Sequence, residues 1–365
     1  MGAIPAPLVA GQPAAAHRPT TPTEDLITLA AGVWLLAGTY LDGWAHNNLH
    51  DLETFFTPWH AVLYSGFAAC AVWIGLLVWR RRAPGAPWPD AVPAGYGAAT
   101  LGVGLFLVSG AADFGWHSEF GIEQGISALF SPSHLGLATG GFLILGAPFA
   151  AASQNPEATS VGRLAPAVVS AMLCGMVAAF ILQQFAVYAR QGLVQTYSGP
   201  PGSRQVSSPP ASSSIIVAQG SFLVSTATLF VPHLLLASRW RIPAWLAAAL
   251  AFVPSVALQA MVAFRDPGLV AAAAVGAALV GAVWAAAGPR PGLWGRLMMA
   301  LAFAPLLFWG TYFASVAMRD GRLTFSTEVW SGIIVWTGLE MLALVALVRI
   351  AQASPRNPGT PAPSR

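Results

Sequence analysis

The sequence predicts an all-α protein, a polytopic transmembrane bundle of about ten helices with an internal helix-hairpin repeat. Of its 365 residues, 56% are hydrophobic and only 8% are charged, and the mean hydropathy is +0.63. Soluble domains carry roughly 25% charged residues. Because this charge cannot cover a water-facing surface of such a size, the lipid bilayer is expected to cover most of it.

The apolar segments have the length that membrane helices need. About 20 apolar residues cross the hydrocarbon core as a helix, and proline and glycine are tolerated within such helices. Ten segments qualify: 25–48, 58–79, 94–117, 132–152, 164–189, 214–238, 243–264, 267–288, 297–318 and 327–348.

The distribution of arginine predicts the topology. The chain has 17 Arg and no Lys, and twelve of these arginines fall in the two tails and the even-numbered turns, against five on the other side. By the positive-inside rule, both termini lie in the cytoplasm. The composition is typical of a bacterial chain, so we expect the inner membrane.

The chain divides into four predicted regions. Two disordered tails, 1–22 and 352–365, are rich in Pro, Ala and Ser. Between them, 23–152 holds the repeated hairpins and 153–351 holds six further helices without an assignable motif. The net charge of +3 gives no indication of a nucleic-acid partner; other membrane subunits or further copies of the chain stay open as partners.

One polar motif occurs twice. It reads Asp-x3-His, then Glu six or seven residues on, then Phe-Ser/Thr-Pro-x-His. Four of the seven histidines of the chain occupy equivalent places in the two copies. The first copy, in helices 1–2, contains Asp42, His46, Glu53 and His60; the second, in helices 3–4, contains Asp113, His117, Glu123 and His134.

The spacing of the motif predicts how its side chains meet. Asp and His four residues apart share one helix face. Ser/Thr-Pro is typical of a helix start, with the hydroxyl as N-cap and proline at the first helical position. The last His of each copy then lies in the first turn of the next helix, at the depth of the Asp and His before the turn. The topology puts both turns on the extracytoplasmic side.

Two imidazoles and one carboxylate are ligands for a transition metal. We therefore predict two metal-ligand sets: Asp42, His46 and His60, and Asp113, His117 and His134. Charged groups inside a membrane are costly, which favours a functional role for them. Five further residues are predicted as neighbours that orient a ligand or relay protons: Glu53, Glu123, Trp44, Trp116 and Glu340.

These residues carry a resemblance. The Asp-x3-His followed by His, and the stretch from Glu53 to His60, resemble the C subunit of the copper membrane monooxygenases, the particulate methane and ammonia monooxygenases. Asp113, His117 and His134 match with a longer insertion. The resemblance covers helices 1–4 only, and this chain has more helices than that subunit. It implies copper, with zinc or iron as alternatives, and oxidation of a small apolar substrate.

Two other functions stay open at this point. A transporter or metal-handling protein would use the same residues to bind a cation transiently, with the glutamates coupled to protons. A structural or accessory subunit would use them as an interfacial hydrogen-bond network and would bind no metal.

Overall fold

The computed structural model describes residues 18–49, 55–121, 129–154, 161–189, 212–287, 294–321, 323 and 325–353. Within them it contains helices and turns and no strand. Ten helical spans are long and apolar enough to cross a membrane, which confirms the predicted fold class.

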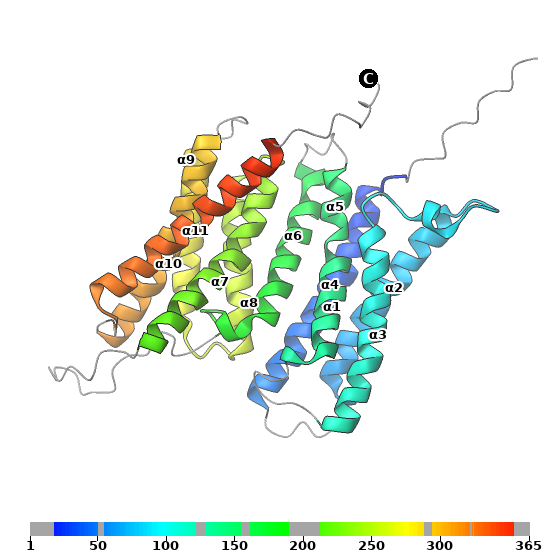
Figure 1. Cartoon of the computed structure of the whole chain (residues 1–365), viewed down its shortest axis with the longest axis horizontal. Helices are drawn as coiled ribbons and strands as arrows, with labels where there is room; N and C mark the ends of the chain where they lie inside the picture. The colour runs from blue at the N-terminus through cyan, green and yellow to red at the C-terminus, as the bar shows by residue number, and fades with distance from the viewer. Residues whose placement is uncertain are drawn as a thin grey trace, which may run out of the picture.

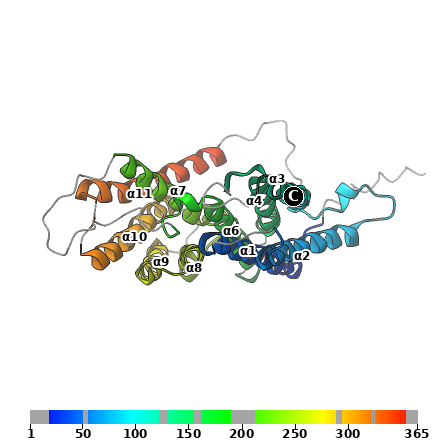
Figure 2. The same cartoon turned by 90° about the horizontal axis from the view of Figure 1, so that it is seen from below.

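The first four spans form two hairpins, which overlap at the right of Figure 1 and are seen apart in Figure 2. Their helices are α1 (Pro22–Asn48), α2 (Pro58–Arg81), α3 (Gly97–Phe120), and α4 (Pro132–Leu145) continued by the short α5 (Ala147–Ser153). A 3-10 turn, η1 (Trp88–Ala91), precedes α3. The sequence expected 132–152 as one helix; α4 and α5 together make that single span, with a break at Gly146.

The remaining spans are α6 (Val161–Ile181), α7 (Ser212–Ala237), α8 (Ala244–Met261), α9 (Pro267–Ala287), α10 (Trp294–Asp320) and α11 (Thr327–Ala353). Helix α6 packs against α1 and α4 on one side and against α7 and α8 on the other. In the view from below, α6 lies between the two hairpins and the group of helices α7–α11 (Figure 2). The ends of α1 and α8 are also joined, since Asn48 Nδ2 donates to the Met261 carbonyl at 3.0 Å.

One predicted boundary was wrong. The segment 164–189 was expected to be one helix, but α6 ends at Ile181 and the 3-10 turn η3 (Gln183–Phe185) follows. The amide of Asn47 donates to Gln183 Oε1 at 3.0 Å, so this polar turn is tied to the end of α1. Helix α6 therefore ends where the side chain of Gln183 has a hydrogen-bond partner on α1.

The hairpins repeat their packing as well as their motif. Gly66, six residues after His60, lies so close to α1 that an added Cβ would come within 2.6 Å of the Leu35 backbone. Gly140, six residues after His134, lies similarly close to α3, because an added Cβ would be 2.8 Å from the Phe106 backbone. Small residues let membrane helices approach closely, so each hairpin crosses at a glycine just beyond its last histidine.

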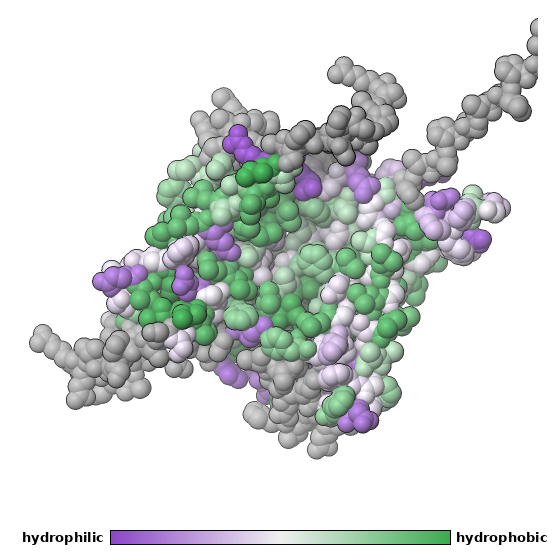
Figure 3. Space-filling model, in the orientation of Figure 1, coloured by the Kyte–Doolittle hydropathy of each residue, from purple (hydrophilic) through white to green (hydrophobic). Residues whose placement is uncertain are grey.

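Apolar residues cover most of the face shown in Figure 3, and hydrophilic ones gather mainly towards the helix ends. The core of the second half is aromatic. Phe222, Phe308, Trp309 and Tyr312 are buried and pack ring against ring between α7 and α10. The core of the hairpins is a separate cluster that includes Leu35, Phe67 and Phe106. The polar motifs lie at one end of this second cluster.

Candidate metal centre

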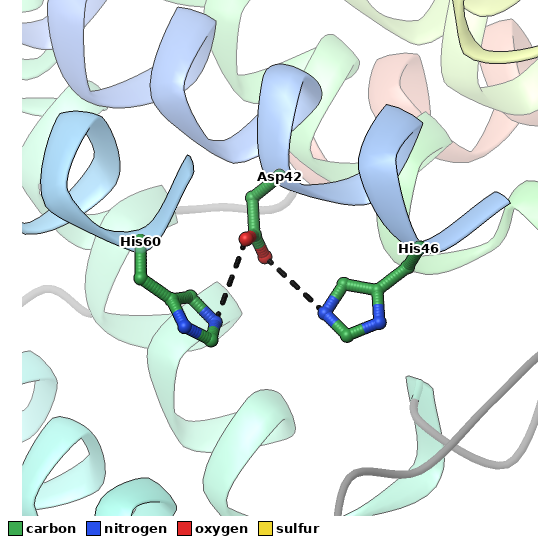
Figure 4. A group of neighbouring side chains, drawn as sticks. All are labelled: Asp42, His46 and His60. Atoms are coloured by element: carbon green, nitrogen blue, oxygen red, sulfur yellow. Dashed lines mark ion pairs between the residues drawn. The ribbon is translucent and has the colours of Figure 1, made fainter. Parts of the chain in front are cut away.

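The first triad consists of Asp42, His46 and His60, and Figure 4 shows both imidazoles directed at the carboxylate. Asp42 and His46 lie one turn apart on α1, and His60 lies in the first turn of α2. His46 Nε2 is 3.8 Å from Asp42 Oδ2, and His60 Nε2 is 3.5 Å from Asp42 Oδ1. The Thr57 hydroxyl accepts from the His60 backbone N–H at 3.1 Å, which is the predicted N-cap.

The second triad consists of Asp113 and His117 on α3 and His134 in the first turn of α4. Both imidazoles face the same oxygen: His117 Nε2 is 3.6 Å and His134 Nε2 is 3.5 Å from Asp113 Oδ1. Ser131 is the N-cap and accepts from the His134 backbone N–H at 3.3 Å. The repeated sequence therefore folds into a repeated side-chain arrangement.

The spacing of these atoms suits a metal ion. One ligand atom from each residue of a triad lies within 4.8 Å of the others, in both triads. Ligands about 2.0–2.2 Å from a tetrahedral ion are about 3.3–3.6 Å from each other. The four His-to-Asp distances, 3.5 to 3.8 Å, are close to that edge length. They exceed the roughly 2.7–2.9 Å of a charge-assisted hydrogen bond.

Backbone carbonyls fix the orientation of two imidazoles. His60 Nδ1 is 2.5 Å from the Phe55 carbonyl oxygen, and His117 Nδ1 is 3.2 Å from that of Gly121. A carbonyl only accepts, so Nδ1 of each ring carries a proton, and the neutral form of the ring has its Nε2 lone pair facing the carboxylate. His117 Nε2 is accordingly buried without a hydrogen-bond partner. In that neutral form, Nε2 of His60 or His117 and a carboxylate oxygen are two acceptors that face each other, and a cation between them would remove the repulsion.

Hydroxyl groups surround the second triad. His134 Nδ1 lies 2.5 Å from Ser131 Oγ, Ser131 Oγ lies 3.1 Å from Ser133 Oγ, and Ser133 donates to Asp113 Oδ1 at 3.0 Å. On the other side, the Tyr64 hydroxyl donates to Asp113 Oδ2 at 3.2 Å. Such outer partners hold ligands in place in known metal sites.

The two triads are neighbours. The ring centroids of His60 and His117 are 6.3 Å apart. The Phe55 ring packs beside both, at 4.7 Å from His60 and 6.0 Å from His117. Helices α2 and α3 therefore bring the two sites into one centre instead of leaving them as separate features of the bundle.

A cavity of about 90 Å³ opens beside this centre, between α1, α4 and α6. It reaches residues of both triads, namely Asp42, His46 and His134. Its other walls are largely apolar, with a few polar groups at one end: Leu35, Leu36, Leu63, Phe106, Leu129, Leu137, Ala138, Gly141, Leu145, Val177, Phe180 and Ile181, with Thr39, Asn47 and Gln183.

The other five predicted residues are not all described by the structure. Glu53 and Glu123 lie outside the described residues. Trp44 packs edge-on against Trp59 at 5.9 Å, and Trp116 packs against Phe120 at 4.7 Å. Glu340 lies on α11, which packs against α7 and α10 in the other half of the molecule (Figure 1). Its Oε2 is buried without a hydrogen-bond partner.

The sequence did not predict two residues of this centre, Tyr64 and Ser133, which both donate hydrogen bonds to Asp113. Tyr64 lies four residues after His60, on the same face of α2, and this i, i+4 spacing was the available signal. Ser133 stands inside the second motif, where the first motif has Trp59. Its contact with Asp113 follows from the hairpin geometry, which the spacing alone does not define.

No protein-family model, curated protein or solved structure matches the chain. The resemblance to the copper monooxygenase subunit therefore rests on the motif residues alone.

Proposed function

We propose that this membrane protein holds two metal ions in adjacent sites, one in each Asp/His/His triad. The observation that carries this proposal is the orientation of His60 and His117. Their Nδ1 atoms face backbone carbonyls, so the Nε2 lone pairs are directed at a carboxylate. Metal-bound histidines almost always donate their other ring N–H to a carboxylate, a backbone carbonyl or water. Asp113 is only 1% exposed, and a buried carboxylate without a compensating cation is costly.

We propose copper as the metal. Imidazole ligands suit copper, zinc, iron and nickel, and copper is the strongest binder of the divalent series. The resemblance of the motif to the copper membrane monooxygenases favours the same choice.

We further propose that the centre oxidises a small apolar molecule. The support is the cavity, whose walls are mainly leucine, valine and phenylalanine and which meets both triads at Asp42, His46 and His134. A ligand lying there would touch the centre while most of its surface contacted apolar side chains. Incorporation of one oxygen atom from O2 into such a molecule also consumes two electrons and two protons, so an external reductant is required.

Oxygen uptake tests this activity. The purified protein, reconstituted with copper and supplied with propene and a soluble reductant, is expected to consume O2 and form an oxygenated product. Ala138→Phe, which adds a ring to the cavity wall, should abolish product formation and leave the copper content unchanged. Its control is Ala271→Phe, at an exposed position on α9 and outside the cavity lining. Equal product from Ala138→Phe and wild type, or copper-bound wild type that forms no product from any small alkene or alkane, would contradict the proposed activity.

A further inference from the structure

The two triads differ in how they hold their carboxylates. In the first, each imidazole faces a different oxygen of Asp42: His60 faces Oδ1 and His46 faces Oδ2. In the second, both imidazoles face Oδ1 of Asp113. The repeated sequence therefore produces two sites of unequal geometry.

Hydrogen bonds account for the difference. Tyr64 donates to Asp113 Oδ2, and Ser133 donates to Asp113 Oδ1. Among the described residues, Asp42 has no hydroxyl donor, and its contacts are His46 and His60. Trp59 occupies the position of Ser133 in the first repeat, and Ala138, four residues after His134, occupies the position of Tyr64 in the second.

We infer that Tyr64 makes the metal centre asymmetric by donating to Oδ2 of Asp113, which holds this oxygen away from the two imidazoles, so that Asp113 binds through Oδ1 alone while Asp42 is free to bind through both oxygens. This inference rests on the proposed function. The second site then offers two nitrogens and one oxygen, and the first offers two nitrogens and two oxygens. The two metal ions would then have different coordination and different spectra, although both triads consist of one Asp and two His.

Tyr64 is well placed for this role. It belongs to α2, the helix of His60, but its hydroxyl reaches the carboxylate on α3. Its ring is held by Phe55 at 5.8 Å and Phe106 at 6.4 Å, so the direction of the hydroxyl is fixed by packing. One side chain thus connects the two triads, and it acts as a positioning residue.

The test isolates each site before changing Tyr64. His46→Ala with His60→Ala leaves only the Asp113 triad, and His117→Ala with His134→Ala leaves only the Asp42 triad. Each is loaded with one equivalent of Cu²⁺ and examined by electron paramagnetic resonance. The two spectra should differ. Adding Tyr64→Phe should shift the spectrum of the Asp113 triad towards that of the Asp42 triad and leave the latter unchanged.

Two further variants complete the experiment. Tyr40→Phe removes a part-buried hydroxyl that donates to the Met176 carbonyl and to neither carboxylate, and it should alter neither spectrum. Ser133→Ala should weaken copper binding at the Asp113 triad about 10- to 100-fold, the usual effect of losing an outer partner.

Identical spectra for the two isolated triads would overturn the inference, and so would a Tyr64→Phe spectrum unchanged from its parent. Both results leave the proposed function intact, because copper is bound. Failure of both isolated triads and of the wild type to bind Cu²⁺ would instead overturn the proposed function, and the inference with it.

Discussion

His60→Ala and His134→Ala are each expected to lower the copper content of the purified protein from two ions per chain to one, and the double variant to remove both. Each histidine is one of three donors in its triad and the only one contributed by the second helix of its hairpin. Loss of an outer partner alone costs about 10- to 100-fold in affinity, and loss of a ligand costs more. Elemental analysis after chelator-free purification in mild detergent measures the result.

His233→Gln is the matched control. His233 lies on α7, where its ring nitrogens contact the carbonyls of Leu229 and Ala247 at 3.0 and 2.8 Å. It is a packing residue of the second half, so this variant should keep two ions. Equal copper loss in all three single variants would indicate general unfolding, and full copper in His60→Ala would exclude the first triad as a site.

Gly66→Val is expected to destabilise the first hairpin severely. A Cβ at this position would lie 2.6 Å from the Leu35 backbone, and backbone cannot give way as a flexible side chain can. Overpacking of a close contact costs about 1–3 kcal/mol, occasionally more. The shift of α2 would also carry His60 away from Asp42, so copper at the first triad should fall with stability. Thermal unfolding in detergent, followed by tryptophan fluorescence, measures the effect.

Gly75→Val provides the comparison on the same helix. An added Cβ at Gly75 meets nothing within 4 Å, so this substitution causes no clash and only changes the helix propensity of the residue. We expect near-wild-type unfolding and full copper content for this variant. If Gly66→Val is as stable as Gly75→Val, the close crossing of α1 and α2 does not hold the first triad together.

The fold was largely predictable because lipid imposes simple rules. Helix length and composition indicated ten spans, and ten are present in the described residues. Ser131 and Thr57 before proline indicated the helix starts that the structure contains. The end of α6 was missed because Gln183 and Gln184 interrupt an otherwise apolar segment, and the pairing of Gln183 with Asn47 depends on a helix far away in sequence.

The candidate site was predictable within each hairpin but not between hairpins. Asp42 and His46 are four residues apart on α1, and the Thr57-Pro58 helix start puts His60 in the first turn of α2. The contact between His60 and His117 depends on how α2 packs against α3, and no local spacing encodes that. Tyr64 was missed for the same reason, since its partner is on the other hairpin.

X-ray absorption at the copper edge of the wild-type protein tests the central claim most directly. We expect about two copper ions per chain, each surrounded by nitrogen and oxygen atoms at about 2.0–2.2 Å, with the outer scattering pattern of imidazole rings. The double variant His60→Ala with His134→Ala should give no such signal. Protein that binds no copper after reconstitution, or copper bound mainly by sulfur, would contradict the account.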